Sequence, residues 1–257
     1  MKQLEWKNAG LAFLLSVPLL FTNCSKDKSE DVAAAPVVIA GTGDINPLLD
    51  EFRSLLGGQL NTTPGPTDGR REINWDGVPD NMLNQKLPED FFNPTAPEAP
   101  VANQRGLRYS ANGNFQVSKT NFAELNPEAA GEFNSFSGTK SFANVSASQW
   151  DVEFQVPGKL RAASVKGFGI VFSDVDVANS TSLEFFNENK SLGKFYVPAK
   201  NGSNFSFLGV YFKNEKVTRI HVQHDGELDK GQKDISANGP FDLVTLDNFL
   251  YSEPIEK

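Results

Sequence analysis

The stretch VKGFGIVFSDVDVANSTSLEFFNENKSLGKFYVPAKNGSNFSFLGVY, residues 165–211, decides the fold. In it Phe168, Ile170 and Phe172 alternate with other residues, and clusters of Asn, Gly and Ser separate this apolar run from the runs that follow. Apolar residues at a period of two, broken at short intervals by turn-forming residues, are typical of antiparallel strands. The stretch therefore predicts four strands of an antiparallel β-sandwich or barrel.

The residues on both sides continue this pattern. Strands are expected close to residues 105–118, 149–156, 217–223 and 243–251. We therefore predict an all-β fold, with an antiparallel β-sandwich over residues 105–254, a short N-terminal helix and an extended N-terminal segment. The expected core contains Trp150, Val152, Phe154, Phe168, Ile170, Phe172, Phe207, Ile220, Val222, Val244 and Leu246.

One helix is expected before the sandwich. Pro47–Leu56 places its apolar residues on one helical face, and Asn46 is a suitable N-cap. Residues 46–104 are interpreted as this helix and an irregular extension packed on the sandwich, with a partner-binding helix as the alternative. Residues 24–45 are interpreted as a flexible tether, although the small apolar run at 32–43 also suits an edge strand.

The N-terminus has the features of a targeting signal. An apolar run at Leu11–Phe21 follows two lysines, and it is shorter than the ~20 residues that a membrane-spanning helix needs. The run ends just before Cys24, the single cysteine of the chain. This segment resembles the signal of Bacteroidetes-type bacterial lipoproteins, in which the cysteine is lipidated. Phe21 and Asn23 depart from the usual residues at their positions.

The lipoprotein resemblance implies a cellular location. Residues 1–23 would be removed, and Cys24 would attach the chain to a membrane through its lipid. Ser25 resembles the residue that accompanies outer-membrane sorting, so we expect an outer-membrane or cell-surface location. The alternative is an ordinary signal peptide with an incidental cysteine.

A candidate ligand site lies in TTPGPTDGRREINWDGVPDNM, residues 62–82. Arg71, Asn74, Trp75 and Asp76 offer a planar donor, an amide, an aromatic face and a carboxylate, which suit sugar recognition. The alternative, which the alternation of apolar and polar residues favours, is an ion-paired edge strand with Trp75 in the core. Tyr109 and Tyr211 are further candidates for stacking against a sugar. For Tyr211 a core role is the alternative.

The composition excludes one class of partner. The formal net charge is -8, and nucleic-acid binding needs clustered Lys and Arg to neutralise phosphates. A lone cysteine also excludes an internal disulfide and a zinc site built on several cysteines.

Signals of catalysis are weak. The chain has no nucleophile elbow, no P-loop and no complete dinucleotide fingerprint, because GFGIVF has only the first two glycines. The only histidines, His221 and His224, lie three residues apart, so on a strand they face opposite sides. His221 is expected to face solvent on the same side as Arg219. No catalytic residue is predicted.

The C-terminal run VTLDNFLY, residues 244–251, resembles the last strand of galactose-binding-like jelly rolls, which include many carbohydrate-binding modules. The resemblance implies a jelly-roll-like sandwich, a glycan ligand and a structural calcium ion near Asp247. Asp174 and Asp176 are further candidate ligands, because carboxylate oxygens on loops suit calcium. Turn and capping roles for these carboxylates are the alternative. The runs GRREINWDGVP, GFGIVFSDVD, SLEFF, FSFLGVYF and LDNFLYSEP also resemble a group of secreted bacterial proteins of unknown function, which implies no activity.

Three functions remain open. The favoured one is a non-catalytic, envelope-anchored module that binds carbohydrate. The others are a jelly-roll hydrolase or lyase acting on glycans, and a structural lipoprotein without a small ligand. Fold class alone does not decide between them.

Overall fold

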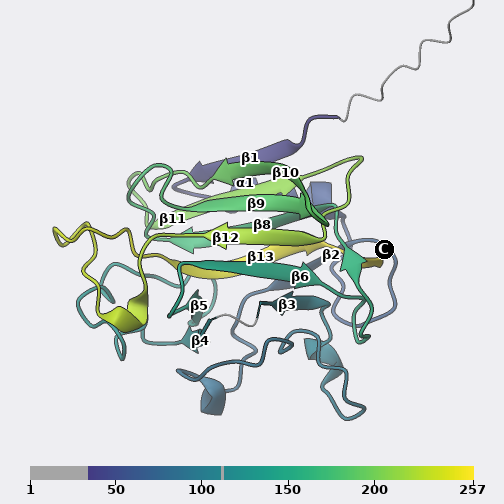
Figure 1. The fold of residues 1–257 in the computed structure, drawn as a ribbon, viewed down its shortest axis with the longest axis horizontal. Coiled ribbons are helices and arrows are strands. Elements are labelled where there is room, and N and C mark those ends of the chain that lie inside the picture. Colours follow the sequence, from purple (N-terminus) through teal and green to yellow (C-terminus); the bar gives the residue numbers. More distant parts are fainter. Residues whose placement is uncertain (1–33, 111–112) are drawn as a thin grey trace, which may run out of the picture. The chain divides into compact units, whose positions relative to one another are not determined.

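The computed structural model describes residues 34–110 and 113–257, and its strands form two large sheets (Figure 1). The seven-stranded sheet has the order β1 (Val37–Thr42), β11 (Phe205–Tyr211), β8 (Gly167–Ser173), β13 (Thr245–Ser252), β5 (Ser141–Asn144) and β4 (Phe115–Ser118), and β2 (Arg70–Ile73) pairs with β13. The five-stranded sheet has the order β10 (Lys190–Tyr196), β9 (Ser182–Asn187), β12 (Arg219–Gln223), β6 (Gln149–Phe154) and β3 (Leu107–Tyr109). The other elements are α1 (Asn46–Leu56), the pair β7 (Ala163–Ser164) and β14 (Ile255–Glu256), and the 3-10 helices η1 (Asp80–Met82), η2 (Val101–Asn103) and η3 (Leu228–Lys230).

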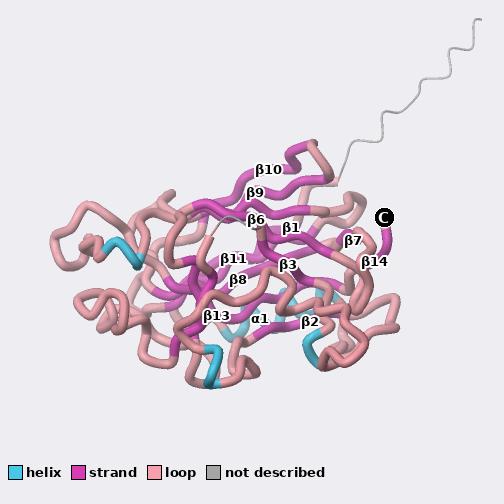
Figure 2. The backbone as a smooth tube through the Cα atoms, turned by 60° about the horizontal axis from the view of Figure 1, so that its bottom comes forward, coloured by secondary structure: helices cyan, strands magenta, loops and turns pink. Residues whose placement is uncertain are grey.

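The two sheets are the layers of a sandwich, with β10, β9, β6 and β3 in one layer and β11, β8 and β13 in the other (Figure 2). Every strand pair in them is antiparallel. The chain repeatedly crosses between the layers, for example from β8 to β9 and from β11 to β12, as in a jelly roll. The predicted all-β sandwich is therefore confirmed.

The main core lies between the two sheets. Phe168, Ile170 and Phe172 of β8 pack there with Trp150, Val152, Phe154, Ile220 and Val222 of the five-stranded sheet. All the core residues predicted from the sequence are buried. Phe207 is the one that packs elsewhere, in the cluster beneath α1.

Helix α1 covers the other face of the seven-stranded sheet. It contacts β1, β11 and β13, and Leu49, Phe52 and Leu56 are its buried residues. Gly169 and Gly209 are paired across β8 and β11, and a Cβ atom on either would lie within 3 Å of the Phe52 ring. The glycines therefore leave room for this ring, which explains the GFG motif as a packing feature. Because both its faces are covered, β8 is buried at every position.

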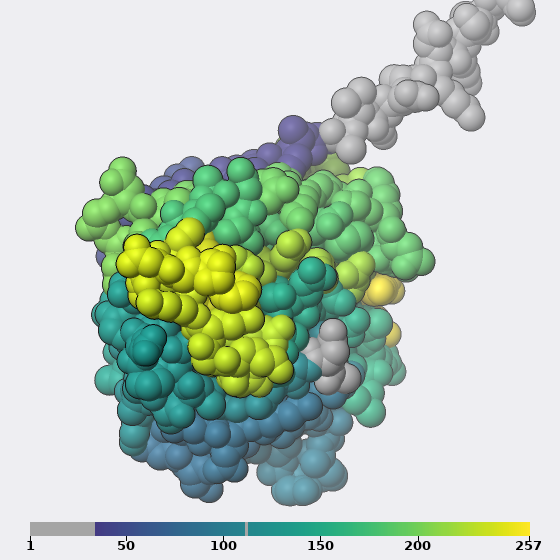
Figure 3. Space-filling view, turned by 60° about the vertical axis from the view of Figure 1, so that its left-hand side comes forward, coloured from purple at the N-terminus to yellow at the C-terminus, as the bar shows by residue number. Residues whose placement is uncertain are grey.

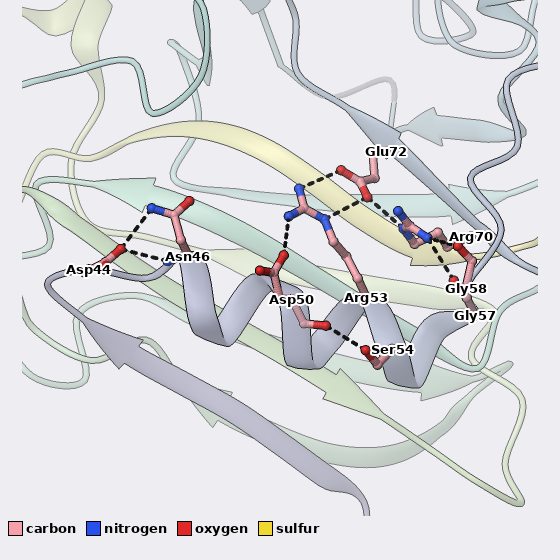
Figure 4. Close-up of polar contacts among 9 residues, drawn as sticks. All are labelled: Asp44, Asn46, Asp50, Arg53, Ser54, Gly57, Gly58, Arg70 and Glu72. Atoms are coloured by element: carbon pink, nitrogen blue, oxygen red, sulfur yellow. Dashed lines mark hydrogen bonds and ion pairs between the residues drawn. The ribbon is translucent and has the colours of Figure 1, made fainter.

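Polar contacts hold the two ends of α1 (Figure 4). The sequence predicts Asn46 as N-cap, but the helix begins at Asn46 itself, and Asp44 Oδ1 accepts hydrogen bonds from Asn46 N at 3.2 Å and Nδ2 at 2.9 Å. Asp44 thus supplies the carboxylate that sequence analysis missed. In the second half of the helix, Arg53 donates to both carboxylate oxygens of Glu72 at 3.0 Å, and Arg70 donates to Glu72 Oε1 at 2.8 Å.

Residues before the predicted sandwich also belong to its sheets. The run at Val37–Thr42 forms β1, an edge strand that pairs with β11. This part of the chain is therefore the edge strand given as the alternative, and not a flexible tether. The edge strand β2 pairs with β13. Cys24 and the signal segment lie outside the described residues. Within the described residues, no helix is long and apolar enough to cross a membrane.

Candidate functional site

Arg71, the first of the residues predicted to bind a ligand, is buried in an ion pair. Its side chain is 0% exposed, and it donates to Glu253 through Nη2 at 2.7 Å and Nε at 2.8 Å. Nη2 also donates to Thr63 O at 3.0 Å. These contacts leave no face of the guanidinium open to a ligand from solvent.

Trp75 is also buried, with 1% of its surface exposed. Its ring stacks on Phe142 with 3.8 Å between the centroids, and its indole N–H donates to Asp247 O at 2.8 Å. Asn74 is exposed, whereas Asp76 accepts a hydrogen bond from Thr139 N at 2.9 Å. The four predicted residues therefore do not form one open surface. The stretch matches the alternative interpretation, an ion-paired edge strand with Trp75 in the core.

The two candidate tyrosines lie in different environments. Tyr109 is 2% exposed and packs on Phe115 in the core, so its ring is covered. Tyr211 is half-buried and lines a cavity of about 490 Å³.

This cavity lies beside the C-terminal end of α1. Gly57 and Gly58 form part of its wall, and Arg70 Nη1 holds their carbonyl oxygens at 3.1 and 2.5 Å (Figure 4). Tyr211, Lys166 and Lys216 also line it. No histidine is among the described residues that line this cavity, so it does not join His221 to carboxylates as an enzyme site would require.

The outer face of the five-stranded sheet offers a second surface. The strands of this sheet contact mainly one another among the described residues, and α1 packs on the other sheet. The surface carries side chains that alternate with core residues along β6, β9, β10 and β12. We call it the polar face and define it by Asp151, Glu184, Tyr196, Arg219, His221 and Gln223.

His221 lies at the centre of the polar face. It is paired across the sheet with Asp151 on one side and with Glu184 on the other. Residues directly opposite one another on antiparallel strands have Cβ atoms about 5 Å apart and share a face. His221 Nδ1 is 2.8 Å from Asp151 Oδ1, and the side chains of both are a little over a quarter exposed. An ionised carboxylate only accepts hydrogen bonds, so Nδ1 carries the proton in this pair.

Arg219 completes this group. Its Nη1 donates to Asp151 Oδ1 at 3.0 Å, and its guanidinium carbon lies 3.9 Å from the centroid of the Phe186 ring. Partial burial raises the pKa of Asp151, but the hydrogen bond from His221 and the charge of Arg219 outweigh it and hold that pKa below its usual value. Asp151 therefore stays ionised and fixes the orientation of both neighbours.

An exposed aromatic side chain, Tyr196, lies at one end of the polar face. Tyr196 is 48% exposed, and the Lys194 ammonium lies 5.6 Å from its ring centroid. Lys194 also donates to Gln223 Oε1 at 2.8 Å. The alternation in QWDVEF and RIHVQ correctly placed His221 and Arg219 on one side of a strand. It could not show that Asp151, Glu184 and Tyr196 would lie beside them.

The candidate calcium ligands divide into two groups. Asp174 and Asp176 lie together with Asp234, and one carboxylate oxygen of each is within 4.8 Å of the others. Lys200 pairs with both Asp174 and Asp176, the latter at 2.8 Å. Burial raises the pKa of Asp174 to about 7, although the bond to Lys200 opposes the rise.

Asp247 does not belong to this cluster. Its Oδ2 accepts hydrogen bonds from Phe136 N at 2.5 Å and Ser137 N at 3.2 Å, on another loop. Burial raises the pKa of Asp247 to about 7, while these hydrogen bonds oppose the rise. Its geometry is that of a buried carboxyl group that holds a loop, and the expected joint site with Asp174 and Asp176 is not present among the described residues.

His224, the second histidine, lies beyond the end of β12 and is 6% exposed. Burial lowers its pKa. The one metal-type cluster found in the described residues contains neither His221 nor His224.

No protein-family model and no curated protein matches this chain. Among solved structures, a family 29 carbohydrate-binding module in complex with mannohexaose is similar at 12% identity and a TM-score of 0.29, covering 73% of this chain and 94% of its own. The carbohydrate-binding module TmCBM61 in complex with β-1,4-galactotriose is similar at 9% identity and a TM-score of 0.26, covering 67% of this chain and 99% of its own. Similarity at this level does not identify a ligand for this chain.

Proposed function

We propose that this protein is a lipid-anchored protein of the cell envelope whose β-sandwich binds carbohydrate on the polar face without catalysing a reaction. The observation that carries the proposal is the arrangement of Asp151, Glu184, His221 and Gln223 in neighbouring cross-strand positions, next to the exposed ring of Tyr196. Among the described residues, no helix and no strand of the other sheet is found packed on the face that bears them.

The chemistry of the polar face matches that of a sugar chain. A pyranose ring offers hydroxyl groups at its edge and C–H groups on its faces. Carboxylate, imidazole and amide groups at the surface of a rigid sheet bind such hydroxyls in fixed directions. The Tyr196 ring supplies an apolar platform with a polar tip. Phe186 is less suited to this role, because Arg219 lies 3.9 Å from its ring centroid, whereas the Lys194 ammonium lies 5.6 Å from that of Tyr196.

Binding fits the geometry better than catalysis does. The polar face is open, and the cavity of about 490 Å³ lies elsewhere and is lined by other residues. The bond between His221 and Asp151 favours a second candidate, a hydrolase or lyase that uses His221 as its base. Within the described residues, no hydrogen bond joins His221 to a serine or threonine that it could activate.

The test measures binding of the full chain, purified in detergent, to an array of oligosaccharides that includes mannohexaose and β-1,4-galactotriose. We expect Tyr196→Ala and His221→Ala each to weaken the best interaction roughly tenfold or more, as the few residues that carry most of the binding energy do. Leu160→Ala is the matched control, because Leu160 is an apolar residue that is 74% exposed and lies outside the polar face.

Three results would contradict the proposal. One is the absence of binding to every glycan, which would leave the structural lipoprotein. Another is equal binding by Tyr196→Ala, His221→Ala and Leu160→Ala, which would move the site away from the polar face. The third is turnover of a polysaccharide that His221→Ala abolishes, which would establish the hydrolase or lyase.

A further inference from the structure

We propose that a calcium ion binds between Asp174, Asp176 and Asp234 and ties together the loops at one end of the sandwich. Asp174 and Asp176 lie in the loop between β8 and β9, and Asp234 lies in the loop between β12 and β13. The latter loop forms the yellow surface that faces the viewer in Figure 3. The site is independent of the proposed carbohydrate-binding function.

The spacing of the carboxylates fits calcium. One oxygen from each of the three residues lies within 4.8 Å of the other two. Calcium binds oxygen at about 2.3–2.6 Å, so two oxygens that share the ion are separated by at most ~5 Å. The 4.8 Å limit on these separations is within the reach of calcium.

Two of the carboxylates carry buried oxygens that have no partner. The Asp174 side chain is 0% exposed and that of Asp176 is 15% exposed, and the Oδ2 atom of each makes no hydrogen bond. A buried carboxylate oxygen without a hydrogen bond or a cation is costly. This feature points to a ligand, because the other buried carboxyl groups of the same region are satisfied. Asp242, for example, accepts from Asp176 N and Val177 N, both at 2.9 Å.

The cluster contains more carboxylates than basic residues that pair with them. Lys200 is the one basic residue that forms an ion pair with it in the described part of the chain, and its ammonium contacts the Oδ1 atoms of Asp174 and Asp176. Asp234 accepts only the backbone N–H groups of Ser236 and Leu243, both at 2.8 Å. One ammonium therefore pairs with two of the three carboxylates, and the Oδ2 atoms of Asp174 and Asp176 remain without a hydrogen bond.

The ion would connect loops that adjoin three strands of the five-stranded sheet. The loop with Asp174 and Asp176 leads into β9, the loop with Lys200 follows Tyr196 of β10, and the loop with Asp234 follows Gln223 of β12. Calcium would therefore rigidify the sandwich at the end where Tyr196 and Gln223 lie. This makes loop order, rather than glycan affinity, the direct readout of the site.

The test is the thermal unfolding and calorimetric titration of the full chain in detergent, with calcium, magnesium or a chelator. We expect calcium to raise the melting temperature and to bind with one site, with magnesium weaker by roughly tenfold or more. Asp176→Asn and Asp234→Asn should each weaken calcium binding roughly tenfold or more. Asp229→Asn is the matched control, because Asp229 is an exposed aspartate of the same β12–β13 loop.

The Lys200→Met variant tests the site without changing any of the proposed calcium ligands. The ammonium repels a divalent ion at the cluster, so its removal should strengthen calcium binding. The proposal is overturned if calcium neither shifts the melting temperature nor gives heat of binding, because Lys200 then neutralises the cluster by itself. It is also overturned if Asp176→Asn and Asp229→Asn bind calcium equally well. We expect Asp176→Asn to keep its glycan binding, because the calcium site and the carbohydrate-binding face are separate proposals.

Discussion

Replacement of Arg71 by methionine should destabilise the fold severely, because it would leave Glu253 as an unpaired buried charge. Both side chains are almost fully buried, at 0% and 1% exposure, and two hydrogen bonds of 2.7 and 2.8 Å join them. Asn61 Nδ2 donates to Glu253 Oε2 at 2.8 Å, and this contact would remain. The substitution keeps most of the side-chain volume, so the lost interaction is mainly electrostatic.

The magnitude follows from the burial of the pair. Removal of one partner of a buried ion pair costs about 3–5 kcal/mol, since the remaining charge keeps its desolvation cost without its counter-ion. An exposed pair contributes about 0.2–1 kcal/mol. Arg161 and Glu256 provide such a pair, with side chains that are 61% and 55% exposed and 3.1 Å between Nη1 and Oε2. The same substitution at Arg161 is therefore the matched control.

The assay is urea-induced unfolding followed by fluorescence, with Arg71→Met, Glu253→Gln, the double variant and Arg161→Met compared. We expect the two single variants at the buried pair to lose several kcal/mol and the double variant to lose less than their sum, since the two residues interact directly. Arg161→Met should lie within about 1 kcal/mol of the wild type. A loss at Arg71 no greater than that at Arg161 would refute the reasoning. A stable Arg71→Met protein with impaired glycan binding would instead restore Arg71 as a ligand residue.

Two further predictions concern the anchor and the pH dependence of stability. Cys24→Ser should release the protein from membranes or block its processing, because the lipid would be lost; fractionation checks this, and unchanged partition into membranes would contradict the anchor. Burial raises the pKa of folded Asp247 to about 7, above its usual 3.8, so the folded state holds a proton that the unfolded state releases. Its contribution to stability is present below pH ~4 and is lost as the pH rises to about 7. Asp247→Asn should therefore flatten the fall in unfolding free energy between pH ~4 and about 7, although Asp174 titrates in the same direction. An identical slope in wild type and variant would argue against this role.

The sequence predicted the strands well, because the alternation of core-facing and outward-facing residues is a local property of the chain. Phe168, Ile170 and Phe172 repeat at a period of two, and this period places all three on the core side of β8. The alternation was less accurate about where a strand ends. The alternation in residues 71–75 continues through Trp75, but β2 ends at Ile73 and Trp75 has a φ of 65°, which turns the chain after the strand.

The sites were less predictable, because they depend on which strands and loops become neighbours. His221 and Asp151 are 70 residues apart, and only the pairing of β12 with β6 places them side by side. Asp234 lies in a polar loop that contains other aspartates, and no local feature separates it from Asp225 or Asp229. Asp247 was grouped with Asp174 and Asp176 through a resemblance, whereas its hydrogen bonds join it to another loop.

Helix α1 determines which face of this sandwich can meet a ligand. Gly169 and Gly209 let the Phe52 ring approach the seven-stranded sheet, and no side chain at those positions could be accommodated without movement of that ring. The helix consequently covers this sheet and leaves the five-stranded sheet with one open face. On that face, the alternation that places Ile220 and Val222 in the core necessarily turns Arg219, His221 and Gln223 outward. The open polar face is thus linked to packing on the opposite side of the molecule, where the cross-strand pair of Gly169 and Gly209 makes room for the helix.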